Sequence, residues 1–266
     1  MTKHTLLDLK NRAGKPQLTF VHVSSAEQAA AAEEAGIDMI GTAFLPQTRA
    51  IPSAAPNTVF RYGLKYGQYP SVEKCLEGAF AAIDCGADII YTAQSLEFVE
   101  AMAKQGIAVC GHVGLVPPLA SWKGGFRAVG KTAEQALGLF QQVKDFENAG
   151  GFAVEIEVVP HRVATEIARR TGLVTISMGA GTGCDVQYLF SSDILGETDD
   201  RIPRHARQYR NMKAEYDRLH QERIAGYREF AEDVNSGNFP SDQNLVSIAD
   251  DEFEKLLDQL ENISCH

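Results

Sequence analysis

The stretch "GGFAVEIEVVPHRV" (Gly150–Val163) decides the fold, because it joins a strand pattern to the start of a helix pattern. Side chains along a strand alternate between its two faces. Glu155 and Glu157 therefore share one face, and Val154 and Ile156 share the other. Apart from the two carboxylates both faces are apolar, which is typical of a parallel strand covered on both sides. The stretch predicts one β–α unit of a parallel sheet.

The same alternation of strand and helix patterns recurs along the chain. The strand-like "QLTFVHV" (17–23) is followed by the helix-like "SAEQAAAAEEAG" (25–36), in which Ser25 is expected to cap the helix. Roughly seven or eight such units favour one (β/α)8 TIM barrel over a doubly wound sheet. The predicted fold class is therefore α/β, a (β/α)8 TIM barrel with additional C-terminal helices.

The composition changes after residue 204. Residues 205–235 are strongly polar with a helical pattern, and "SIADDEFEKLLDQLEN" (247–262) is an acidic amphipathic pattern. We expect a barrel over residues 1–204 and a C-terminal helical extension over residues 205–266. The extension is expected to pack on the barrel or on a neighbouring subunit.

Composition and charge exclude several classes of protein. The 266 residues carry a formal net charge of -10, which argues against general nucleic-acid binding. The basic cluster at 201–210 fits a solvated helix face or a subunit contact better than an anion site. No apolar run reaches the roughly 18 residues of a membrane span, and the N-terminus lacks the apolar core of a secretory signal. Five scattered cysteines without a CxxC motif predict reduced thiols in a cytoplasmic protein.

In a (β/α)8 barrel the chemistry sits at the C-terminal ends of the strands. Glu157 lies near the end of its strand, just before Pro160, so its carboxylate is expected to project into this mouth. Glu155 lies about one layer deeper, where an unpaired carboxylate is costly to bury. We expect Glu155 to be structural and paired, with His22 or Lys65 as the nearest candidate partner by strand position. The other polar or glycine residues at predicted strand ends are Thr42, Gly63, Thr92, His112 and residues 178–181.

Six blocks of sequence occur in an order and spacing that resemble one family. They are "GHVGLVPP" (111–118), "GGFRAVGK" (124–131), "AGGFAVEIEVVP" (149–160), "ISMGAGTGCDVQ" (176–187), "SDILGETDDRIPRHARQY" (192–209) and "VNSGNFP" (234–240). The sequence resembles ketopantoate hydroxymethyltransferase, of the phosphoenolpyruvate mutase/isocitrate lyase superfamily, over nearly the whole chain. The resemblance implies a homo-oligomeric (β/α)8 barrel of pantothenate biosynthesis. It also implies transfer of a one-carbon unit from methylenetetrahydrofolate onto the carbon next to the carbonyl of a small α-keto acid.

The resemblance assigns two candidate catalytic residues. The catalytic glutamate of the family falls on Glu157, and the histidine of its "GHxGLxP" motif falls on His112. In the family a divalent metal binds the oxygens of the keto acid and stabilises the enolate, while a base removes the α-proton. The alternatives are a structural ion pair for Glu157 and a hydrogen bond to a neighbouring loop for His112.

The metal ligands of the family do not carry over to this sequence. Phe44 stands at the position of the Asp in the "GDS" turn, Gly63 at the Asp of "DLPF", and Ala93 at the Glu of "KxEGG". The lysine of that last motif becomes Tyr91, and "VSS" (23–25) replaces "AYD". Since Mg²⁺ requires oxygen ligands, we predict no metal-ligating residues and no Mg²⁺ bound in the manner of the family.

Other groups at the mouth are candidates to bind the substrate. Lys65 could supply part of the electrostatic role of the metal or form a Schiff base with a keto acid, unless it is an ordinary surface residue. Glu155 replaces an apolar residue of the family, so the inner barrel layer gains a carboxylate. The substrate-binding candidates are Lys65, His22, Thr42, Tyr91 and Glu155.

Three functions remain open from the sequence. The first is a hydroxymethyltransferase-like enzyme that acts on a small α-keto acid at a rebuilt, metal-independent site. The second is a different C–C lyase, aldolase or hydrolase on the same barrel, because loops and not the core set the chemistry. The third is a non-catalytic homologue that binds a metabolite or assembles with partners.

Overall fold

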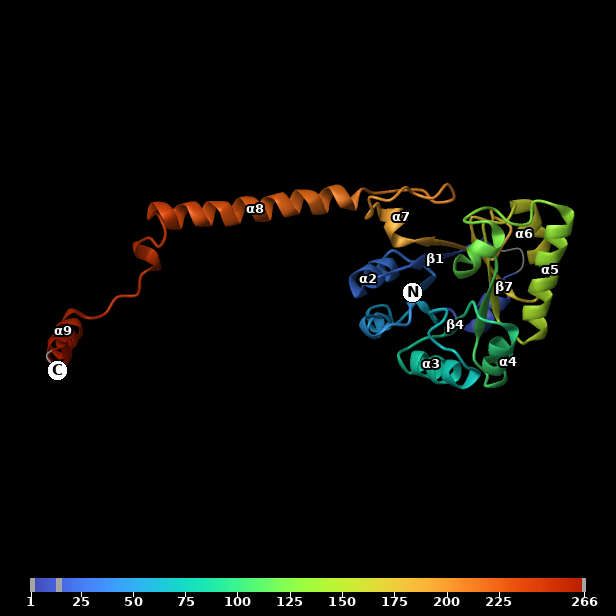
Figure 1. The fold of residues 1–266 in the computed structure, drawn as a ribbon, viewed down its shortest axis with the longest axis horizontal. Helices are drawn as coiled ribbons and strands as arrows, with labels where there is room; N and C mark the ends of the chain where they lie inside the picture. Colours follow the sequence, from blue (N-terminus) through green and yellow to red (C-terminus); the bar gives the residue numbers. More distant parts are fainter. Residues whose placement is uncertain (1–2, 13–15, 265–266) are drawn as a thin grey trace. The chain divides into compact units, whose positions relative to one another are not determined.

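Eight parallel strands form a closed barrel in the order of the sequence, as the β–α alternation predicts (Figure 1). This is a computed structural model, and it describes residues 3–12 and 16–264. Each strand pairs with the next, and β1 closes the barrel by pairing with β8. The fold is a (β/α)8 TIM barrel. Its strands are β1 (Leu18–His22), β2 (Met39–Ala43), β3 (Val59–Gly63), β4 (Ile89–Tyr91), β5 (Val109–Gly114), β6 (Ala153–Glu157), β7 (Val174–Met178) and β8 (Val186–Phe190).

Helices cover the outside of the barrel, and most of them follow a strand directly (Figure 1). Ser25 caps α2 as the sequence predicts, because its side chain accepts a hydrogen bond from the backbone N–H of Gln28. Two connections of the described chain lack an α-helix. The proline-rich link between β2 and β3 forms the 3₁₀ turns η1 (Pro46–Thr48) and η2 (Pro52–Ala54), and a glycine-rich loop joins β7 to β8. The barrel helices are α1 (Leu6–Lys10), α2 (Ala26–Glu34), α3 (Val72–Asp84), α4 (Leu96–Lys104), α5 (Ala133–Asn148), α6 (His161–Ala168) and α7 (Ser191–Leu195), with the 3₁₀ helix η3 (Pro117–Lys123) after β5.

The alternation along β6 separates the barrel interior from the layer beneath the helices. Val154 and Ile156 pack outward into a core shared with α5 and α6. Ala153 packs inward with the other apolar residues of the barrel interior. Glu155 and Glu157 share the strand face of Ala153, and both are buried. Both carboxylates therefore lie inside the barrel. Glu157 lies at the mouth, and Glu155 lies one layer below it.

The segment before the long C-terminal helix differs from the sequence prediction. Residues 205–235 were expected to be helical, but α8 (Met212–Ser236) begins only at Met212. Before that point the chain is bound to the barrel, because the backbone N–H of Tyr209 donates to the carbonyl of Ile194. The ring of His205 also lies against Gly179, where an added Cβ would come within 2.9 Å of it. These contacts hold residues 205–211 in an irregular path.

The chain divides into two compact units, one ending at Asn211 and one beginning at Met212. The second unit contains α8, the short 3₁₀ helix η4 (Asp242–Asn244) and α9 (Asp250–Ser264). Apolar side chains of α9 recur at helical spacing and are 40–48% exposed within the described chain: Phe253, Leu256, Leu257 and Leu260. Where these helices pack stays a prediction. None of the described helices combines the length and the apolar character that crossing a bilayer requires.

Candidate functional site

A cavity of about 310 Å³ lies at the C-terminal end of the barrel, a volume suited to a small ligand. It is lined by residues at and just below the C-terminal ends of the strands, together with Lys65 and with Pro117 and Pro118 of η3. The structure brings every predicted site residue to this one cavity, while their individual roles stay predictions. These residues are His22, Thr42, Lys65, Tyr91, His112, Glu155 and Glu157.

Three of these side chains form a chain of polar contacts at the mouth. The Tyr91 hydroxyl lies 2.6 Å from His112 Nδ1, and His112 Nε2 lies 3.2 Å from Glu157 Oε2. Burial raises the pKa of the Tyr91 phenol well above its usual value, so the phenol stays protonated beside the imidazole. When Tyr91 donates to Nδ1, the imidazole carries its proton on Nε2, the tautomer that turns an N–H and not a lone pair toward the Glu157 side.

His112 Nε2 is buried and has no hydrogen-bond partner, although Glu157 lies within ion-pair distance. The two observations agree if the N–H does not point at the carboxylate, since a hydrogen bond requires direction as well as proximity. An orphaned buried donor beside a carboxylate is costly for folding. It is therefore a group that a ligand in the cavity could satisfy.

The backbone around Glu157 is tightly constrained. Gly114 pairs with Glu157 in the barrel and has a φ of +91°, and a Cβ at this position would come within 2.3 Å of the Glu157 carbonyl oxygen. The next residue, Val158, has a φ of 50°, which is unfavourable for a β-branched side chain. Such strain persists where surrounding structure imposes it and is frequent at functional sites. The "GHVG" motif thus holds the strand end that carries Glu157.

Glu155 forms a buried ion pair with Arg61 of β3. Arg61 Nη1 donates to Glu155 Oε2 at 2.7 Å, and the two side chains are 6% and 5% exposed. Three aromatic rings surround the guanidinium, with their centroids 4.4–4.9 Å from its central carbon: Phe20, Tyr91 and Tyr188. Pairing with a carboxylate and contact with ring faces both favour a buried guanidinium.

The prediction that His22 or Lys65 pairs with Glu155 is therefore wrong. Arg61 lies within the strand pattern "VFRYGL". It shares a strand face with Val59, which points into the barrel, and this alternation is the signal that identifies Arg61 as an interior residue. The physical reason is that β3 and β6 are not neighbours in the sheet. Only closure of the barrel brings their inward side chains together across the interior.

His22 and Lys65 differ in their surroundings. Burial, with a further contribution from the charge of Arg61, lowers the pKa of His22 to about 4. The His22 ring is therefore neutral at neutral pH, and it lies 4.6 Å from the ring of Phe190. Lys65 is exposed at the rim of the cavity. Neither residue supplies a buried positive charge.

The three positions that lack the acidic ligands of the family behave differently in the structure. The Phe44 ring packs outward against Tyr62, at a centroid distance of 5.0 Å, so it does not face the cavity. Gly63 lines the cavity without a side chain. Ala93 lines a neighbouring hollow. None of these three positions offers a ligand for a metal ion.

A different group of side chains has the spacing of a metal site. One ligand atom each from His112, Glu155 and Glu157 lie within 4.8 Å of one another. The set does not fit Mg²⁺, which prefers oxygen ligands in octahedral geometry, because one ligand is an imidazole nitrogen. In addition, the Glu155 carboxylate already accepts from Arg61, whose positive charge would repel a cation beside it.

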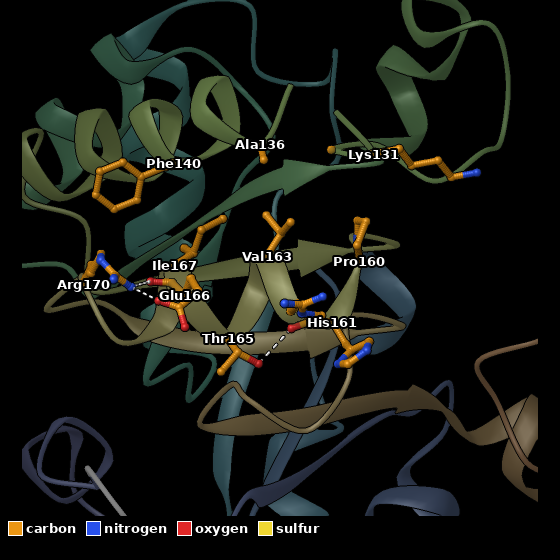
Figure 2. Close-up of a pocket in the computed structure, with 12 residues that line it drawn as sticks. Lys131, Ala136, Phe140, Pro160, His161, Val163, Thr165, Glu166, Ile167 and Arg170 are labelled. Carbon is orange, nitrogen blue, oxygen red and sulfur yellow. Dashed lines mark hydrogen bonds and ion pairs between the residues drawn. The ribbon is translucent and has the colours of Figure 1, made fainter. Parts of the chain in front are cut away.

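A larger hollow of about 810 Å³ lies on the outer surface between α5 and α6. Figure 2 shows Ala136 and Phe140 of α5 facing Val163 and Ile167 of α6 across it. Glu166, the one carboxylate among its lining residues, is paired with Arg169 and Arg170, which follow the end of α6. The hollow is separate from the barrel mouth and is not the candidate active site.

Comparison with known proteins identifies the relatives of this chain. A sequence model of the family described as ketopantoate hydroxymethyltransferase matches residues 24–242. The 3-methyl-2-oxobutanoate hydroxymethyltransferase of Thermotoga neapolitana is 31% identical, with 90% of this chain and 95% of that protein covered. Its counterpart from Kosmotoga olearia is 33% identical, with 88% and 94% covered.

Solved structures confirm the fold. A phosphonopyruvate hydrolase in complex with oxalate and Mg²⁺ superposes with a TM-score of 0.53 at 13% identity, covering 100% of this chain and 99% of that one. A putative phosphonomutase from Burkholderia cenocepacia J2315 gives 0.54 at 13% identity, covering 68% and 88%. At this identity the likeness concerns the barrel alone.

The two glutamates should respond differently to neutralisation. Glu155→Gln leaves the charge of Arg61 buried without its counterion, so we expect the free energy of unfolding to fall by about 3 kcal/mol. Glu157→Gln removes no such pair and should change the free energy of unfolding by less than about 1 kcal/mol. Urea denaturation of both variants beside the wild type measures the difference. Equal losses in the two variants would contradict this assignment.

The neutral His22 should make stability depend on pH. Between the unfolded pKa of 6.5 and the folded pKa of about 4, the unfolded chain binds more protons, so stability falls as the pH falls through this window. At pH 4 the penalty is roughly 2–3 kcal/mol. His22→Gln, which cannot titrate, should lose that much less stability than the wild type between pH 7 and pH 4. The free energies of unfolding are measured in urea at each pH. If those of the wild type and His22→Gln fall in parallel between pH 7 and pH 4, His22 is not a buried neutral histidine.

Proposed function

We infer that this chain, which belongs to the ketopantoate hydroxymethyltransferase family, is an enzyme that transfers a hydroxymethyl group to a small α-keto acid. The proposed acceptor is 3-methyl-2-oxobutanoate, the acid that names its relatives. The proposed one-carbon donor is methylenetetrahydrofolate, as the family resemblance implies. The reaction forms a C–C bond at the carbon next to the keto group.

One observation carries the proposal: Glu157 and His112 lie 3.2 Å apart in a cavity of small-molecule size. Glu155 accepts from Arg61, whereas the polar side chain beside the Glu157 carboxylate is His112. Its carboxylate can remove the proton from carbon 3 of the keto acid, and the electron pair moves to the keto oxygen. The N–H of His112 Nε2 can donate to that developing oxyanion. Water releases the one-carbon unit from methylenetetrahydrofolate at the formaldehyde level, with breakage of its C–N bonds and departure of tetrahydrofolate. The enolate then re-forms the keto group as carbon 3 bonds to that carbon, whose oxygen takes a proton to give the hydroxymethyl group.

We propose that this enolisation proceeds without Mg²⁺. The proposal rests on the poor fit of the cavity ligands to that ion and on the positive charge that Arg61 already holds beside Glu155. A fixed cation near the keto acid can stabilise developing negative charge as a metal does, provided that it is already in position.

A second candidate reaction is C–C bond cleavage of a related keto acid. The observation that favours it is the loss of three family carboxylates together with the gain of the Arg61–Glu155 pair inside the barrel. Both reactions share the enolate, and only transfer requires the folate. Product formation with and without methylenetetrahydrofolate separates the two.

Proton exchange tests the proposed base directly. The wild type should exchange the carbon-3 hydrogen of 3-methyl-2-oxobutanoate for deuterium in D₂O, as followed by proton NMR. Glu157→Gln should lower the exchange rate by about 10²–10⁴-fold, the usual contribution of a general base. Glu166→Gln, the same change on the outer hollow of Figure 2, is the control and should leave the rate unchanged. A wild type that never catalyses exchange would instead favour a non-catalytic binding protein.

We also propose a cytoplasmic homo-oligomer. The four described cysteines are free thiols, as expected in a reducing compartment. The exposed apolar side chains of α9 suit burial against a second copy of the chain. Light scattering at micromolar concentration should report a multiple of 29.0 kDa, and Leu257→Glu with Leu260→Glu should lower that mass. A monomeric wild type would count against the proposal.

A further inference from the structure

Arg61 is the only lysine or arginine that is buried in the described part of the chain. It lines the cavity from one inward position below Gly63 on β3. Its place at the bottom of the cavity raises the question of what the guanidinium does besides pairing with Glu155.

The guanidinium has more donors than Glu155 uses. It carries five N–H groups in a planar fork, and Nη1 contacts Glu155 Oε2 and, at 3.8 Å, Cys110 Sγ. The ring of Tyr188 lies against it, with its centroid 4.8 Å from the central guanidinium carbon. Guanidinium groups commonly serve more than one oxygen acceptor and match carboxylates with two parallel bonds. A second carboxylate entering the cavity could therefore share this fork.

Competing cations are poorly placed for that role. Lys65 is exposed at the rim, and His22 is uncharged near neutral pH because its pKa lies at about 4. An anion that enters the cavity must also lie near the carboxylate of Glu157, so it needs a positive charge nearby. Inside the barrel, Arg61 provides that charge.

We propose that Arg61 binds the carboxylate of the 2-oxo acid substrate, in the role that a metal ion has in the family. The inference rests on the proposed function for its substrate class. Arg61 Nη1 lies 2.7 Å from Glu155, and the ligand atoms of Glu155 and Glu157 lie within 4.8 Å. A keto acid of a few carbons can thus reach from Arg61 to Glu157. Its carboxylate would lie deep in the cavity against Arg61, and its carbon 3 would lie beside the Glu157 carboxylate.

Direct binding measurements test the proposal without any turnover. The probe is 3-methyl-2-oxobutanoate, titrated by calorimetry in EDTA, with 3-methylbutan-2-one as the matched ketone that lacks a carboxylate. Arg61→Met alone would leave Glu155 buried and unpaired, so the informative variant is Arg61→Met with Glu155→Met, which removes both charges. This double variant should bind the acid at least about tenfold more weakly, because a charge-assisted bidentate contact is lost. Its affinity for the ketone should not change.

Two further variants separate anion binding from a structural role. Glu155→Gln keeps Arg61 and frees it from its counterion, so it should bind the acid as tightly as the wild type or more tightly. A merely structural pair would instead make Glu155→Gln and the double variant lose affinity together. Lys131→Met, on the outer hollow away from this cavity, is the control and should retain binding. Lys65→Met tests the competing cation at the rim of the cavity. Melting temperatures establish that each variant is folded at the temperature of titration.

Wild-type affinity in the double variant, or loss of binding in Lys65→Met alone, would overturn the inference. A separate assay, product formation with methylenetetrahydrofolate, tests the proposed reaction. A protein that binds the acid through Arg61 but transfers no one-carbon unit would refute the proposed reaction and support this inference.

Discussion

The Arg61–Glu155 ion pair is the constraint on which the interior of this barrel depends. Two charges buried at 6% and 5% exposure are tolerated only when they neutralise each other and keep their hydrogen bonds. The rings of Phe20, Tyr91 and Tyr188 enclose the guanidinium and fix its position. Where many barrels fill this layer with aliphatic side chains, this chain holds a salt bridge directly below the mouth.

That pair sets the electrostatics of the cavity above it. Since Glu155 is matched by Arg61, Glu157 is the buried carboxylate left beside His112. With Tyr91 against Nδ1, the orphaned Nε2 of His112 is the ring nitrogen open to a ligand. In the proposed reaction Glu157 is the base, His112 the donor and Arg61 the fixed cation, and all three line one small cavity. Together they would stabilise the enolate on which the proposal depends.

The sequence predicted those parts of the structure that depend on local pattern. Period-two alternation placed Glu155 and Glu157 on one inward face, and ordered motifs brought His112 to the same mouth. It failed for Arg61, because a contact across the barrel between β3 and β6 depends on closure and not on sequence neighbours. It also placed the long helix too early, because the hydrogen bond from Tyr209 to Ile194 is a tertiary contact that no helical propensity reports.

The central proposal is that a fixed guanidinium, and not Mg²⁺, supports proton removal in this cavity. Its most direct test is the rate of carbon-3 proton exchange of 3-methyl-2-oxobutanoate in EDTA-treated protein, measured before and after addition of Mg²⁺. The account predicts the same rate in both conditions, because Arg61 remains in place. Exchange that is absent in EDTA and is restored by Mg²⁺ would contradict it.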